Sequence, residues 1–249
     1  MTFMLSSATA EQSLLVEACL IVALLAYGTL LAKYVPLKAH IGANFFAAIL
    51  TIMFGLLIGL SLPEMGLTLT GVKSFVLISL AATAVIFIGT FAVSFLPFLK
   101  HIFLNESFAN ARKRKIFFEA GFRIPLGTAL VEEILFRGVL LGILLQSHSA
   151  LTASLIAAVV FGLWHIMPSI NSIESNSAVQ ERLREKSLHT FGSVFGIVVV
   201  TAIAGFFFSW LRILSGTIFT TWLVHWAINS SGAVSSALQG SLHRKKISK

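Results

Sequence analysis

The chain has 249 residues, of which 57% are hydrophobic and only 11% are charged, whereas about 25% of the residues of an ordinary soluble domain are charged. This composition excludes a water-soluble globular protein, because one core of this size could not bury so much apolar surface. The formal charge of +8 does not indicate a nucleic-acid partner, since the basic residues lie in short loops and at the C-terminus, as in proteins anchored in a lipid bilayer.

Long apolar stretches follow one another along the chain, and this pattern predicts an all-α, polytopic transmembrane bundle with about seven spans. We expect a single integral membrane domain over residues 1–249. The fourth span is expected to begin at the membrane interface around Glu119 and to enter the bilayer near Pro125. The predicted spans are Ser13–Leu31, Ala43–Leu62, Ser74–Leu99, Phe118–Leu145, Ala150–Ile166, Phe191–Leu211 and Thr217–Leu238.

The distribution of basic residues predicts which side of the membrane each loop occupies. With the N-terminus outside, 14 of the 18 lysines and arginines fall in inner segments, and only Lys73 and Arg212 fall in outer ones. The remaining two, Arg123 and Arg137, belong to the fourth span. Because inner loops carry the excess of positive charge, we expect an N-out, C-in protein of a bacterial plasma membrane with a cytoplasmic C-terminus.

The fourth span carries Glu132, Glu133 and Arg137 at positions where ionisable groups are costly. Such a group near the bilayer centre costs about 2.5–3.5 kcal/mol on insertion scales, so it needs a partner or a function. Glu133 and Arg137 are four residues apart and share a helix face, which predicts a buried ion pair. Glu132 is rotated about 100° away and is expected to have no local counter-charge, an environment suited to a general base. The alternative is an inert structural network of all three.

The fifth and seventh spans carry further polar residues. The fifth ends in Phe161-Gly-Leu-Trp-His165, and the seventh contains His225-Trp-Ala-Ile-Asn229. His225 and Asn229 are four residues apart, so their side chains project from one face of the helix. Taken alone, each group is also compatible with a structural role, as an interfacial histidine or an inter-helix hydrogen-bonding pair. Together with the glutamates, they supply the groups needed to activate a water and to stabilise an oxyanion.

Three motifs, in this order, resemble those of the CAAX-protease and bacteriocin-processing family, also called the Abi or CPBP family. They are EExxxR at Glu132–Arg137, FxxxH at Phe161–His165 and HxxxN at His225–Asn229. The resembling region covers residues 118–238, the expected catalytic core, and residues 1–117 supply additional N-terminal spans.

The resemblance implies an intramembrane glutamate-type endopeptidase that cleaves near the membrane–cytoplasm boundary. It implies that Glu132 and His165 activate water and that His225 and Asn229 stabilise the oxyanion. Glu133, Arg137 and Phe161 would be supporting residues. The substrate would be a peptide or protein, either prenylated or anchored in the membrane by other means.

Two questions stay open from the sequence. Glu132, His165 and His225 are also a zinc-type ligand set, although no HExxH motif occurs and we favour chemistry without a metal cofactor. A non-proteolytic immunity scaffold and a proton-coupled transporter are the alternative functions, since buried carboxylates and imidazoles also mark transport pathways. Aspartate is absent and Cys19 is the single cysteine, which excludes an aspartyl protease and a thiolate metal cluster.

Overall fold

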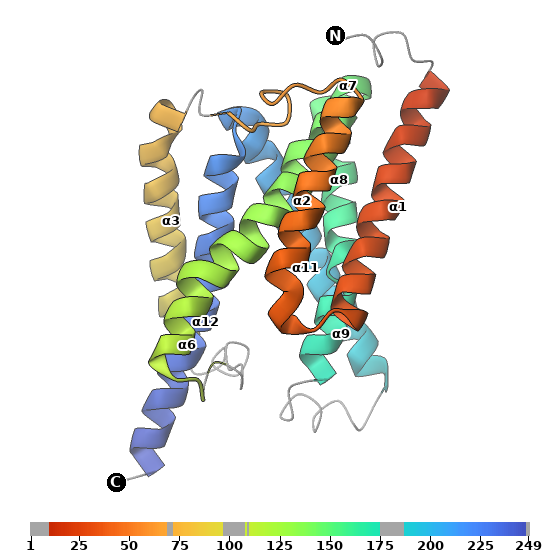
Figure 1. Ribbon diagram of the computed structural model, residues 1–249. Helices are drawn as coiled ribbons and strands as arrows, with labels where there is room; N and C mark the ends of the chain where they lie inside the picture. Colours follow the sequence, from red (N-terminus) through yellow and green to blue (C-terminus); the bar gives the residue numbers. More distant parts are fainter. Residues whose placement is uncertain (1–9, 69–71, 97–107, 109, 175–186, 248–249) are drawn as a thin grey trace.

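The computed structural model describes residues 10–68, 72–96, 108, 110–174 and 187–247. The regular elements of this part of the chain are all helical, which confirms the predicted all-α class. Figure 1 shows them side by side as a bundle, crossed diagonally by a long path that ends in α7. The elements are α1 Ala10–Tyr34, η1 Leu37–Ala39, α2 His40–Leu57, α3 Val72–Ser94, α6 Lys113–Phe118, η2 Glu119–Leu130, η3 Glu133–Leu140, α7 Leu141–Ser147, α8 Ala150–Trp164, α9 Ile166–Glu174, α11 Ser187–Ser215 and α12 Ile218–Ile247.

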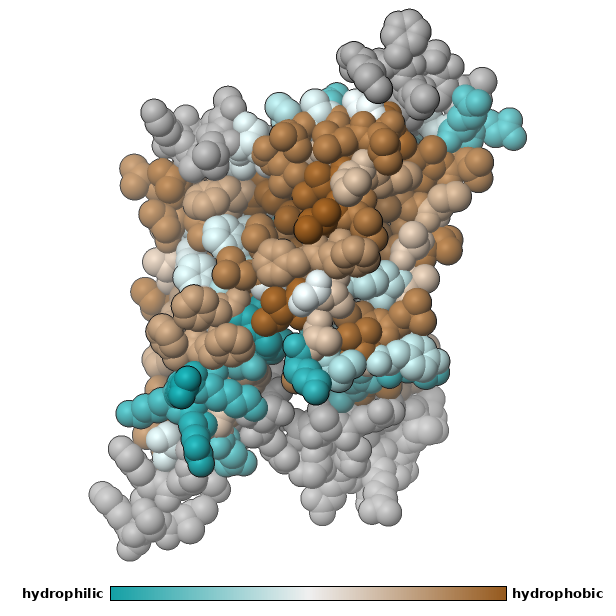
Figure 2. All heavy atoms as spheres, viewed as in Figure 1, coloured by the Kyte–Doolittle hydropathy of each residue, from teal (hydrophilic) through white to brown (hydrophobic). Residues whose placement is uncertain are grey.

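Five helical segments in the described ranges are long and apolar enough to cross a membrane. Their outward faces expose large apolar side chains such as Leu30, Leu77 and Phe207, and Figure 2 shows the resulting hydrophobic belt. Such a surface is stable against lipid but not against water. The segments are Ala10–Tyr34, Leu37–Leu57, Phe75–Ser94, Ala150–Ile173 and Phe191–Ser215.

The fourth and seventh predicted spans are absent from this set of five segments. Each holds several of the polar residues that the sequence singled out, and α12 also buries Ser231, Ser235 and Gln239. These residues lower the hydropathy of the helices that carry them. The expected number of seven spans and the N-out orientation therefore remain predictions.

One uninterrupted helical path runs from Lys113 to Ser147 through α6, η2, η3 and α7, and the residues at its internal junctions keep helical backbone angles. Two stretches of it, η2 and η3, are π-helical, with bonds from each N–H to the carbonyl five residues earlier. π-Helical turns are rare and occur frequently at functional sites. Both glutamates of the EExxxR motif lie at or next to the start of η3.

Pro125 lies inside η2, and its missing N–H leaves the carbonyl five residues earlier, that of Ala120, without its π-helical donor. That carbonyl instead accepts hydrogen bonds from Trp226 Nε1 at 2.8 Å and Ser230 Oγ at 3.0 Å, both on α12. One turn earlier on α12, Trp222 Nε1 donates to the Pro125 carbonyl at 2.7 Å. The irregular backbone of η2 therefore provides the acceptors that fix α12 against it.

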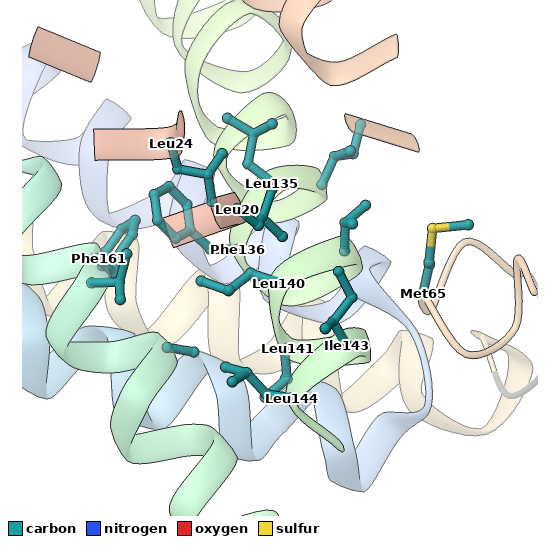
Figure 3. Packing of buried hydrophobic residues seen from close by; sticks show 14 of the residues in the cluster. Leu20, Leu24, Met65, Leu135, Phe136, Leu140, Leu141, Ile143, Leu144 and Phe161 are labelled. Carbon is teal, nitrogen blue, oxygen red and sulfur yellow. The ribbon is translucent and has the colours of Figure 1, made fainter. Parts of the chain in front are cut away.

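The apolar core lies on the other side of the long helical path. Leu135 and Phe136 of η3 are fully buried, as are Leu140 and Leu141. Figure 3 shows them packed with Leu20 and Leu24 of α1, with Met65 of the α2–α3 connection and with Phe161 of α8. This core holds η3, and with it both glutamates, against helices from both ends of the sequence.

Candidate active site

Glu133 and Arg137 form the buried ion pair that their spacing predicts. Arg137 Nη1 lies 3.4 Å from Glu133 Oε1, and the two side chains are 1% and 0% exposed. The other terminal nitrogen, Nη2, donates to the carbonyl of Gly205 on α11 at 3.3 Å. Removal of either partner of the pair would leave an uncompensated charge in an apolar interior. The Arg137–Gly205 hydrogen bond joins η3 to α11.

Aromatic rings surround the Arg137 guanidinium. Its central carbon lies 4.0 Å from the ring centroid of Phe161, 5.1 Å from that of Phe208 and 5.9 Å from that of Phe136. A cation over an aromatic face is attracted to the ring quadrupole, most strongly where water is excluded. A side chain at Gly205 would bring its Cβ to 3.1 Å from Phe161 and 3.4 Å from Arg137, so glycine allows α11 to approach this closely.

His225 of α12 lies between the two glutamates. Its Nδ1 is 2.8 Å from Glu133 Oε1, and its Nε2 is 3.6 Å from Glu132 Oε2. The expectation that Glu132 has no local counter-charge is therefore wrong, since an imidazole that becomes cationic on protonation faces it. The sequence could not show this contact because it depends on how α12 is placed against η3.

Glu132 differs from Glu133 in what it contacts. Oε1 of Glu133 is shared between Arg137 and His225. Glu132, in contrast, makes no hydrogen bond within the described part of the chain, and the Oε2 atom of each glutamate is buried without a hydrogen-bond partner. Leaving a buried carboxylate oxygen unbonded costs about 1–3 kcal/mol or more. Glu132 is therefore the less engaged of the two carboxylates.

His165 follows the last residue of α8, and its side chain is partly exposed. Its Nδ1 lies 2.7 Å from the Phe161 carbonyl. A carbonyl only accepts hydrogen bonds, so Nδ1 carries the proton and Nε2 of the neutral ring is left as the acceptor. The FxxxH spacing thus fixes the tautomer, because the carbonyl of its first residue holds the histidine four positions later.

The Phe161 ring brings the two histidines into one neighbourhood. Its centroid lies 4.6 Å from that of His165 and 6.0 Å from that of His225, both in edge-on arrangements. Phe208 stacks on the other side of His225 with centroids 5.1 Å apart. Phe161 therefore lies between the two imidazoles, and Phe208 covers His225, the imidazole that contacts the glutamates.

The family model described as "Type II CAAX prenyl endopeptidase Rce1-like" matches residues 116–231. Over these residues the chain is similar to the Rce1-like family. The match confirms the family resemblance seen in the three motifs, and it covers all the candidate site residues. No curated protein and no solved structure matched the chain.

The match over residues 116–231, together with the apolar helices, supports a CAAX-type intramembrane protease at family level. Residues 232–238 of the predicted core lie beyond the match. The region before residue 116 lies outside it as well, and supplies α1, α2 and α3.

Asn229 lies one turn after His225 on α12 and is partly buried. Within the described residues, no hydrogen bond joins its side chain to the glutamates or the histidines of the site. The structure therefore brings together Glu132, Glu133, Arg137, Phe161, His165 and His225 by direct contact. Asn229 shares only the helix that carries His225.

The contribution of α11 to the site could not be predicted from the sequence. Gly205 and Phe208 lie in a long apolar stretch that reads only as a membrane span, yet they provide a carbonyl and a ring to Arg137. Likewise, Ala120 accepts the two hydrogen bonds that dock α12. A proline inside a predicted helix is the one signal that points to such a freed carbonyl.

A zinc site at Glu132, His165 and His225 is the alternative interpretation of these residues. Across the described ranges, no group of three or more His, Cys, Asp or Glu side chains is arranged so that it could hold a metal ion. Glu132, His165 and His225 therefore do not form a three-ligand set in this arrangement.

Proposed function

We propose that the chain is an intramembrane endopeptidase that hydrolyses a peptide bond near the membrane–cytoplasm boundary with a water activated by Glu132 and His165. The observation that carries this proposal is the contrast between the two adjacent glutamates. Oε1 of Glu133 is engaged by both Arg137 and His225, whereas Glu132 makes no hydrogen bond in the described part of the chain, although Oε2 of each is unpartnered. The match to the Rce1-like family supports the class of reaction.

Glu132 acts as the general base in this proposal. A water bound at its free oxygen loses a proton to the carboxylate as the water oxygen attacks the carbonyl carbon of the substrate. His165 presents the unprotonated Nε2 of its fixed tautomer to the same water and orients it. Collapse of the tetrahedral intermediate breaks the C–N bond, and Glu132 returns its proton to the departing amine.

His225 stabilises the oxyanion through Nε2. Its Nδ1 donates to Glu133, so Nε2 acts as a donor in the imidazolium form of the ring. Asn229 supplies a second donor from the next turn of α12. Preorganised donors of this kind contribute about 2.7–4 kcal/mol each to stabilisation of the transition state. Glu133 and Arg137 are positioning residues, which hold His225 and η3.

The substrate we propose is a membrane-anchored or prenylated peptide, since the Rce1-like family is described as prenyl endopeptidases and the protein's surface is apolar. The catalytic step itself needs no cofactor from outside the chain.

Cells that carry Glu132→Gln in place of the wild type test this proposal without knowledge of the substrate. The change keeps the shape of the side chain and removes the base, so uncut precursors should accumulate in the membrane proteome while the level of the protein stays normal. Re-expression of the wild type should remove them. Identical membrane proteomes in the two strains, at equal protein levels, would reject Glu132 as the base, and preserved cellular function in the variant would favour a scaffold.

A further inference from the structure

A groove lies away from the catalytic side chains, between α3, the α6–η2 segment and α12. It has a volume of about 760 Å³ and shares Ala120, Trp226 and Ser230 with the hydrogen bonds that dock α12 on η2. His225 and Asn229 do not line it. The groove is therefore a second site, adjacent to the candidate active site but not part of it.

The walls of this groove are apolar and its rim is basic. Phe87 of α3 and Val234 and Leu238 of α12 line its length, and Arg112 and Lys113 line one end, where α6 begins. Figure 2 shows hydrophilic side chains gathered over α6, directly below the hydrophobic belt. An apolar channel alongside a spanning helix, with two cations at one end, matches an amphiphile that has a hydrocarbon chain and an anionic head.

We propose that this groove binds an anionic phospholipid, with an acyl chain between α3 and α12 and the phosphate at Arg112 and Lys113. The bilayer supplies this molecule at high local concentration. The large apolar side chain of Phe117, 70% exposed without a ligand, gains a hydrocarbon neighbour. Because the lipid contacts the same turns of α12 that bond to Ala120, its binding stabilises the position of the helix that carries His225.

The charge part of the proposal is tested with purified full-length protein in mixed micelles, by measuring the affinity for phosphatidylglycerol and for phosphatidylcholine. Each basic residue near an anionic headgroup contributes about fivefold in affinity, so Arg112→Gln with Lys113→Gln should weaken phosphatidylglycerol binding roughly 30-fold. The matched control is Arg114→Gln with Lys115→Gln, which removes the same charge from exposed positions of α6 that do not line the groove. This control should keep wild-type affinity.

The shape part is tested by filling the groove. Gly121 lines it, and a Cβ there meets no atom within 4 Å, so Gly121→Leu should block the acyl chain without a backbone clash. Gly89→Leu on α3 is the matched control, because its Cβ also meets nothing and it does not line the groove. We expect loss of phosphatidylglycerol binding in Gly121→Leu and retention in Gly89→Leu.

Three results would overturn the proposal. Equal weakening by the two charge pairs would show diffuse surface attraction, and equal affinity for the two phospholipids would remove the role of the anionic head. Normal phosphatidylglycerol binding by Gly121→Leu, with weaker cleavage of a lipid-modified peptide, would assign the groove to the substrate's own tail. The binding measurements need no catalytic activity, so they stand apart from the peptidase proposal.

Discussion

Buried glutamates occur both in α1 and on the long helical path that carries the EExxxR motif, and the contacts of Glu17 and Glu132 differ. Glu17 of α1 is 4% exposed and one of its oxygens lies 2.9 Å from His148 Nε2. Glu132 is 8% exposed and has only the longer 3.6 Å contact with His225. A buried carboxylate with a close partner fits a structural role, whereas one held near an imidazole without a hydrogen bond is available for a substrate or a water.

The same contrast holds for whole helices. α1 and α2 turn large apolar side chains outward and are identified by hydropathy alone. α12 runs beside α3 (Figure 1) and buries several serines and Gln239, whose amide nitrogen donates to the Ser94 carbonyl of α3. The helix that carries His225 and Asn229 is therefore among the least apolar of the long helices. The polar residues that α12 buries lower the hydropathy by which a membrane span is recognised.

The largest expected effect comes from replacing Glu132 with glutamine, with the same replacement of Glu17 as the comparison. Glu132→Gln should lower the rate of peptide cleavage by roughly 10²–10⁴-fold, the usual contribution of a general base. Glu17→Gln should keep activity, because α1 contributes no group to the chemistry. Rates from purified protein in proteoliposomes check this pair. Equal loss of activity in both variants would mean that burial of a carboxylate, and not its place in the site, is what matters.

A smaller effect is expected from breaking the two ion pairs on the long helical path. Arg137→Met leaves Glu133 buried with His225 alone and should lower the free energy of unfolding by about 3–5 kcal/mol. The matched change Arg123→Met breaks the pair with Glu119, in which the arginine is 23% exposed, and should cost less than Arg137→Met because water reaches this pair. Denaturation in detergent measures both. A larger loss in Arg123→Met would contradict a central role for Arg137.

The docking of α12 provides a third comparison. Trp226→Phe removes the hydrogen bond to the Ala120 carbonyl and should cost about 1 kcal/mol of stability. Trp210→Phe on α11 is the control, since that indole is 39% exposed and has no such bond. If the two variants lose the same stability, the carbonyl freed by Pro125 does not hold α12.

The smallest effect is a pH dependence outside the spanning helices. Hydrogen bonds from the Ser61 hydroxyl and backbone N–H lower the pKa of Glu64 from 4.5. A lowered carboxyl pKa adds stability above the ordinary value, and this stability is lost as the pH falls through the folded pKa. Ser61→Ala should therefore slightly lower the melting temperature at pH 7 and have no effect at low pH, where the carboxyl is protonated in both proteins. A larger difference in acid would reverse the sign and reject this origin.

Local spacing predicted what lies on a single helix, and tertiary packing decided the rest. The four-residue separation of Glu133 and Arg137 predicted their ion pair. The same separation in FxxxH puts His165 within reach of the Phe161 carbonyl. The sequence did not predict that His225 contacts Glu133, because the register between α12 and η3 depends on Ala120 and its freed carbonyl. Gly205 and Phe208 left no signal, since glycine and phenylalanine are common in any membrane span.

Cleavage in ¹⁸O-labelled water tests the proposed chemistry most directly. Wild-type protein in proteoliposomes, given a prenylated peptide and the same peptide without its lipid, should release a fragment with a single ¹⁸O atom in its new terminal carboxylate. Glu132→Gln should release almost none. A labelled product formed by Glu132→Gln at the wild-type rate, or no cleavage of either peptide by folded wild-type protein, would contradict water activation by Glu132.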